Sequence, residues 1–135
     1  MSEDRGLIDT SVAVVIRELD ASLFPAEVAI SALTLGELAT GPSAAVDELT
    51  RARRQSHLLF IESNLEALPF DPKCARAYGV VYAAVKAKGR KPRGARTVDL
   101  MIAATALAHE LPLYTLNAKD LRGLEQLVEI VDVGS

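Results

Sequence analysis

The sequence predicts an α/β protein in which helices cover both faces of a parallel β-sheet. Short aliphatic runs typical of strands alternate along the chain with longer segments whose apolar residues recur at helical spacing. Half of the 135 residues are hydrophobic and a quarter are charged, which is ordinary for a globular protein. No repeat, linker or low-complexity tract divides the sequence. We therefore predict a single domain over residues 1–135.

Five segments rich in aliphatic and β-branched residues predict the strands. These segments are residues 6–8, 26–32, 66–70, 111–116 and 127–133. Helical segments separate them, and strands joined through helices run parallel. The sequence therefore predicts a central parallel sheet of four or five strands.

Capping residues and helix breakers delimit the predicted helices. The helical segments are 10–19, 35–40, 44–63, a long one that starts at Asp71-Pro72, the alanine-rich helix that Asp99 opens and a short turn over 118–124. The second of these stops at Gly41-Pro42, and Ser43 is expected to cap the third. Asp71 and Pro72 are a strong helix start, with aspartate as the N-cap and proline at the first helical position.

Charge and cysteine content exclude several classes of protein. A formal net charge of −3 argues against a protein that coats nucleic acid through bulk charge, so phosphate recognition would need a local patch. The single cysteine, Cys74, excludes an intramolecular disulfide, and two histidines leave no Cys/His zinc site. The N-terminus lacks the apolar segment of a signal peptide, and the longest nearly apolar run, 100–108, is too short to span a membrane. We therefore expect a soluble, cytoplasmic protein with no membrane partner.

Four acidic residues lie where predicted strands end or the next helices begin. Asp9 ends the first strand, Glu37 follows the second, Asp99 opens the alanine-rich helix, and Asp120 follows a later strand with Asn117 just before it. Ligands of open parallel sheets bind beyond the carboxyl ends of the strands. The four acids therefore predict a common site at that edge of the sheet.

Each acid also has a structural explanation. Asp9 can cap the first helix, and Thr34 and Glu37 have the spacing of a capping box in which Glu37 reaches back to the Thr34 N–H. Asp99 in a first turn interacts favourably with the helix dipole, and Asp120 has a weaker arrangement of the capping kind. Spacing alone leaves capping and a shared site open.

Four gathered carboxylates would repel one another unless a cation held them. Oxygen ligands with no histidine or cysteine among them suit Mg²⁺ or Mn²⁺. Such ions support cleavage of phosphodiester bonds.

A basic segment precedes Asp99 and could hold a phosphate backbone. Residues 86–96 contain no acid and carry Lys86, Lys88, Arg90, Lys91, Arg93 and Arg96. A solvated loop is an equally good explanation. A second basic cluster, Arg51, Arg53 and Arg54, is expected to face solvent or a partner.

Four stretches of the sequence resemble PIN domains of the VapC toxin family, the ribonuclease halves of type II toxin–antitoxin pairs. They are "LIDTSV", "ISALTLGELATG", "TVDLMIAATALAHELPLYTLNAKDL" and "GLEQLVEIVDV", which follow one another in the family's order over nearly the whole chain. The resemblance implies a PIN-like three-layer α/β/α fold. In that family the acids that match Asp9, Glu37 and Asp99 hold Mg²⁺ or Mn²⁺.

The resemblance also implies function and partners. It implies metal-dependent endonucleolytic cleavage of RNA, often tRNA or rRNA, which would inhibit translation. It implies a homodimer, and a toxin–antitoxin hetero-oligomer in which the C-terminal tail of a VapB antitoxin enters the active-site groove.

One position departs from the family pattern. Many PIN domains have a fourth aspartate where this sequence has Asn117, so Asp120 is expected to be the fourth acid with Asn117 as a helper. The hydroxyls of Thr10 and Ser11 could contact a phosphate or a metal-bound water, although capping is the simpler use of both. Because asparagine supplies no charge, a second interpretation stays open, in which a PIN-like module binds RNA or an antitoxin-like partner without cleaving.

Overall fold

The chain folds around a five-stranded parallel sheet in the order β3-β2-β1-β4-β5. The computed structural model describes residues 4–89 and 96–134. The strands are β1 Arg5–Ile8, β2 Glu27–Ser31, β3 Glu66–Leu68, β4 Leu113–Thr115 and β5 Ile130–Asp132. Each neighbouring pair is parallel, which confirms the predicted α/β class and the predicted number of strands.

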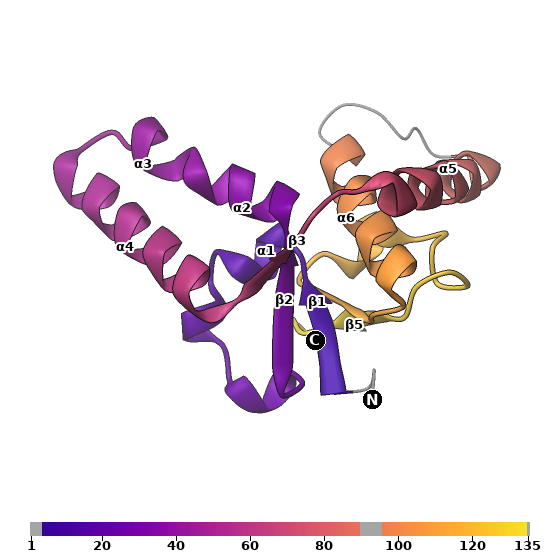
Figure 1. Cartoon of the computed structure of the whole chain (residues 1–135), viewed down its shortest axis with the longest axis horizontal. Helices are drawn as coiled ribbons and strands as arrows, with labels where there is room; N and C mark the ends of the chain where they lie inside the picture. Colours follow the sequence, from indigo (N-terminus) through magenta and orange to yellow (C-terminus); the bar gives the residue numbers. More distant parts are fainter. Residues whose placement is uncertain (1–3, 90–95, 135) are drawn as a thin grey trace.

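Helices lie on both sides of this sheet. They are α1 Thr10–Ala13, α2 Ala32–Ala39, α3 Gly41–Ala44, α4 Glu48–Asn64, α5 Pro72–Ala87 and α6 Arg96–His109, with 3₁₀ turns η2 Ile16–Glu18, η3 Ala21–Leu23 and η4 Ala118–Leu121. Figure 1 shows α2 to α4 on one side of the strands and α5 and α6 on the other, as in a three-layer fold. Within the described residues, no helix has the length and apolar character needed to cross a membrane.

Two apolar cores lie on the two faces of the sheet because successive strand residues point to opposite sides. Leu7 and Ala29 belong to the core with α5 and α6. Their neighbours Ile8 and Ile30 belong to the core with α1 and α4. Both faces are therefore covered, which is why these strands read as nearly continuous apolar runs in the sequence.

The predicted helix over 10–19 is wrong in length. Only α1 forms, and the chain then passes through η2 and η3 before β2 begins. Val14, Val15 and Ile16 are consecutive β-branched residues, which lowers helix propensity where α1 ends.

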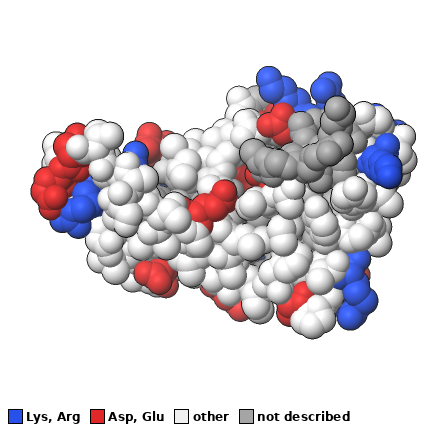
Figure 2. Space-filling model, turned by 90° about the horizontal axis from the view of Figure 1, so that it is seen from above, with Lys and Arg blue, Asp and Glu red and all other residues white. Residues whose placement is uncertain are grey.

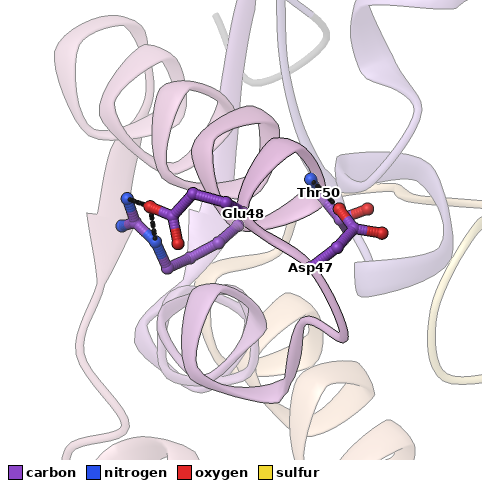
Figure 3. Close-up of polar contacts among 4 residues, drawn as sticks. Asp47, Glu48 and Thr50 are labelled. Carbon is purple, nitrogen blue, oxygen red and sulfur yellow. Dashed lines mark hydrogen bonds and ion pairs between the residues drawn. The ribbon is translucent and has the colours of Figure 1, made fainter.

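The predicted long helix over 44–63 is also divided. Ser43 lies inside the short α3, and Asp47 caps α4 by accepting a hydrogen bond from the Thr50 N–H at 2.7 Å. Figure 3 shows this cap and the ion pair of Glu48 with Arg51 on the first turns of α4. By contrast, the predicted start of α5 is confirmed, since Asp71 caps it with Pro72 at its beginning.

The strand order reverses beside β1, and this reversal indicates where a ligand site is expected. From β1 the chain moves outward through β2 and β3, and then returns to add β4 and β5 on the other side of β1. In open α/β sheets such a reversal leaves a crevice at the carboxyl ends of the strands. The residues that follow β1, β2 and β4 therefore lie where a ligand is expected.

Candidate active site

Asp9 is the first residue after β1 and caps α1. Its Oδ1 accepts hydrogen bonds from the Val12 N–H at 3.2 Å and from the Ser11 hydroxyl at 2.6 Å. The Ser11 oxygen in turn accepts from the Leu116 N–H at 3.1 Å. One hydroxyl therefore fixes the Asp9 carboxylate and ties it to the segment that follows β4.

Glu37 is not part of a capping box, so that structural explanation is wrong. Helix α2 begins at Ala32, and Ser31 caps it by accepting from the Leu33 N–H at 3.0 Å. Thr34 and Glu37 consequently lie within the helix, with the Thr34 side chain buried and Glu37 exposed. The Glu37 carboxylate is left available for other contacts.

Thr10 joins the Asp9 turn to Glu37. Its Oγ1 donates to Glu37 Oε1 at 2.5 Å and lies 3.0 Å from Thr34 Oγ1. Residues 24 and 27 positions apart in the sequence thus meet between α1 and α2. The expected proximity of the Asp9 and Glu37 segments is present, with Thr10 as the link.

The structure places the other predicted acids on the expected elements. Asp99 is exposed in the first turn of α6, and the half-buried Asp120 lies in η4. Asn117 is the residue before η4, and its side chain makes no capping hydrogen bond there. Its backbone N–H donates to Thr115 Oγ1 at 2.9 Å, which fixes the path of this segment.

The structure does not draw these acids into one tight cluster. Across residues 4–89 and the described side chains after residue 96, no three His, Cys, Asp or Glu side chains form a group that could hold a metal ion as they stand. Figure 2, which looks down on the upper face of Figure 1, shows acidic side chains near its middle and, at its left end, beside basic ones. The metal site predicted from the sequence stays a prediction.

The basic segment is only partly described. Arg90, Lys91 and Arg93 lie outside the described residues, and so does the side chain of Arg96, the first residue of α6. Lys86 and Lys88 are exposed at the end of α5. The suggested phosphate contacts of this segment therefore stay a prediction.

A groove of about 770 Å³ extends from Glu37 between η2 and α4. Its wall combines apolar side chains with basic ones, among them Val14, Leu38, Leu58, Arg17, Arg53 and Arg54. The sequence suggested that Arg53 and Arg54 face solvent or a partner, and both line this groove. The sequence did not suggest Arg17 as part of this surface, because no sequence pattern connects that residue to α4.

His57 lines this groove and forms a hydrogen bond with the backbone of α1. Its Nε2 lies 2.8 Å from the Ala13 carbonyl oxygen, which fixes that nitrogen as the donor. Its Nδ1 lies 3.1 Å from the Arg17 guanidinium, which stacks over Phe60 with 4.7 Å from its central carbon to the ring centroid. Helix α4 is thereby joined to the same α1 that carries Thr10 and Ser11.

This arrangement matches a known domain family. The PIN domain matches residues 7–125, a span that contains all four acids. Ribonuclease VapC5 of Mycobacterium tuberculosis is 36% identical over 113 residues, which cover 82% of this chain and 81% of that protein. The chain is a PIN domain of the VapC family. The resemblance noted in the sequence is confirmed.

Other comparisons agree with this assignment of the PIN domain. Ribonuclease VapC8 of Mycobacterium tuberculosis is 34% identical over 103 residues, covering 75% of this chain and 89% of that protein. A crystal structure of VapBC-5, a toxin–antitoxin system of Mycobacterium tuberculosis, contains a chain that superposes with a TM-score of 0.84 at 35% identity, covering 96% of this chain and 99% of that one. DNA-bound VapBC from Salmonella typhimurium gives a TM-score of 0.74 at 27% identity, with 95% and 97% covered.

Proposed function

We propose that this VapC-family chain is an endoribonuclease toxin that hydrolyses RNA phosphodiester bonds with the help of Mg²⁺ or Mn²⁺. The observation that carries the proposal is the hydroxyl link between Glu37 in α2 and the Asp9 turn that follows β1. Relatives at 34 and 36% identity are named ribonucleases. Cleavage of tRNA or rRNA in the cytoplasm would inhibit translation.

The donor chemistry of the site fits a hard divalent cation. Asp9, Glu37, Asp99 and Asp120 offer only carboxylate oxygens, the ligand type that Mg²⁺ and Mn²⁺ prefer. These four acids would hold the ion. When bound, it supplies Lewis-acid stabilisation of the charge that develops on the scissile phosphate.

The remaining site residues position the acids and the substrate. Ser11 and Thr10 hold the carboxylates of Asp9 and Glu37 in place through donated hydrogen bonds. Arg90, Lys91, Arg93 and Arg96 are assigned to the RNA backbone, where basic side chains neutralise phosphates. Asn117 is assigned to orienting water or substrate through its amide.

The proposed partner is a VapB-type antitoxin, and the proposed assembly is a homodimer joined to it as a toxin–antitoxin hetero-oligomer. The groove that starts at Glu37 gives such a partner an apolar surface edged by arginines and direct access to the active site. A chain that fills it would cover Glu37 and block RNA.

One alternative has specific support. A PIN module that binds RNA or an antitoxin-like partner without cleaving would tolerate Asn117 and would not need preformed metal ligands. The feature that favours this alternative is Asn117, which supplies no charge where many PIN domains have a fourth aspartate.

Cleavage of purified tRNA and rRNA tests the proposal. Wild-type protein with Mg²⁺ or Mn²⁺ should give discrete fragments, and both EDTA and Asp99→Asn should abolish them, because each removes the cation or one of its anionic ligands. Glu62→Gln, which removes an exposed carboxylate on α4, is the matched control and should cleave like wild type.

A folded wild type that cuts neither RNA pool with either metal, and takes up no Mn²⁺ in a calorimetric titration, would support the non-cleaving alternative. Fragments that survive EDTA would instead contradict the metal requirement.

A further inference from the structure

Among the buried polar side chains of the described residues, Thr34 makes its hydrogen bond to a side chain of the candidate site. Those four are Ser31, Thr34, Thr105 and Thr115. The other three bond backbone groups: Ser31 caps α2, Thr105 donates to the Met101 carbonyl, and Thr115 accepts from the Asn117 N–H. The Thr34 side chain, 0% exposed, directs its hydroxyl to another side chain, that of Thr10.

The number of protons fixes the direction of this contact. A carboxylate only accepts, so Thr10 spends its single hydroxyl proton on Glu37 Oε1. Its oxygen can then only accept from Thr34, 3.0 Å away. The chain of donation runs from Thr34 through Thr10 to Glu37. Each bond in such a chain polarises the next, so the Thr34 donor strengthens the bond that Thr10 gives to the carboxylate.

We propose that Thr34 is a positioning residue that orients Glu37 through Thr10. This inference rests on the proposed function, because it takes Glu37 as a ligand of the cation that serves RNA cleavage. Thr34 does not touch metal or RNA itself. Buried one helical turn before Glu37, it keeps the Thr10 hydroxyl turned toward the carboxylate, and Thr10 is the direct hydrogen-bond partner of the proposed ligand.

A pair of substitutions at Thr34 separates the hydroxyl from the packing. Thr34→Val keeps the shape of the side chain and removes the donor, whereas Thr34→Ser keeps the donor. Thr105→Val is the matched control, since it removes an equally buried threonine hydroxyl from α6. Circular dichroism and thermal melting of each variant establish that it is folded.

The main readout is the affinity for Mn²⁺, measured by calorimetric titration of the metal-free protein. Thr34→Val should weaken Mn²⁺ binding about 10-fold and lower kcat for RNA cleavage to a similar degree, in the range typical of groups behind a metal ligand. Thr34→Ser should stay within about twofold of wild type, and Thr105→Val should match wild type.

A double-mutant cycle tests the route through Thr10. If Thr34 acts only through Thr10, adding Thr34→Val to Thr10→Val should weaken Mn²⁺ binding no further than Thr10→Val alone. If Thr34→Val does not fold, the Mn²⁺ affinity of Thr10→Val tests the same hydrogen-bond chain. Thr10 is only half-buried, so this variant should fold.

Unchanged Mn²⁺ affinity in folded Thr34→Val, or an equal loss in Thr105→Val, would overturn the positioning role while leaving the proposed function intact. A wild type that binds no Mn²⁺ and cuts no RNA would overturn both.

Discussion

Glu37 has no part in starting its helix, and this makes its role testable. Ser31 provides the cap of α2, and Glu37 follows well inside the helix with its side chain exposed. Its described hydrogen bond comes from Thr10, and the amide oxygen of glutamine can accept the same bond. The carboxylate charge can therefore be removed with little effect on the fold.

We predict that Glu37→Gln lowers RNA cleavage at least about 100-fold, because a proposed metal ligand loses its charge. The melting temperature should stay within about 2 °C of wild type, since no buried contact is lost. Cleavage rates and thermal melting of the same preparations provide the measurement. A melting temperature many degrees lower, with cleavage intact, would instead show that Glu37 supports the fold.

At the scale of elements, aspartates cap the start of several helical segments, and their protonation at low pH should weaken these caps. Asp20, Asp47 and Asp71 each accept a backbone N–H bond at the start of η3, α4 or α5, and that bond lowers the pKa of each carboxyl below its ordinary value. A lowered pKa means that the folded state favours the ionised form. The stabilisation is therefore present above the ordinary pKa and lost as the pH falls through the lower, folded-state value.

We expect the melting temperature to fall as the pH drops from about 5 to about 3, with part of the slope due to Asp71. Asp71→Asn keeps a good N-cap but cannot titrate, so its melting temperature should depend less steeply on pH over that range. Thermal melting at closely spaced pH values measures both slopes. Equal slopes for variant and wild type would show that Asp71 does not contribute.

At the scale of the whole molecule, the sequence predicted the sheet better than the helices. The apolar runs of the strands and the Asp71-Pro72 helix start are patterns of residues adjacent in the sequence. They could therefore be identified before the fold was known. The break between α3 and α4 could not, because the pattern of apolar residues continues across it while Asp47 provides a competing cap. The end of α1 coincides with the β-branched run Val14, Val15 and Ile16, whose apolar spacing still fits a helix although its helix propensity is low.

The candidate site was predicted in part for the same reason. The order of the acids along the chain follows from the sequence, and the structure has Asp9 directly after β1 and Asp120 in η4, after β4. Thr34 was assigned to a capping box because its spacing from Glu37 fits one, and only the buried Ser31 cap excludes it. The hydrogen bond between Thr34 and Thr10 joins segments 24 residues apart, so patterns of neighbouring residues could not predict it.

Cys74 offers a probe of how tightly the whole molecule is packed. It lies in the first turn of α5 with 0% of its surface exposed, and burial raises the pKa of its thiol. Only the thiolate reacts with disulfide reagents, so both burial and protonation protect it. The native protein at neutral pH should therefore react with such a reagent at least about 100-fold more slowly than the urea-unfolded chain, through opening of the fold.

Labelling rates measured across a urea series test this directly, because Cys74 is the single cysteine. If global unfolding exposes the thiol, the rate should rise with urea in parallel with the loss of helical circular dichroism. A rate that is already high without urea would show that the start of α5 opens on its own. In that case Asp71→Ala, which removes the cap at that end, should raise the rate further, whereas Asp47→Ala at the start of α4 should not.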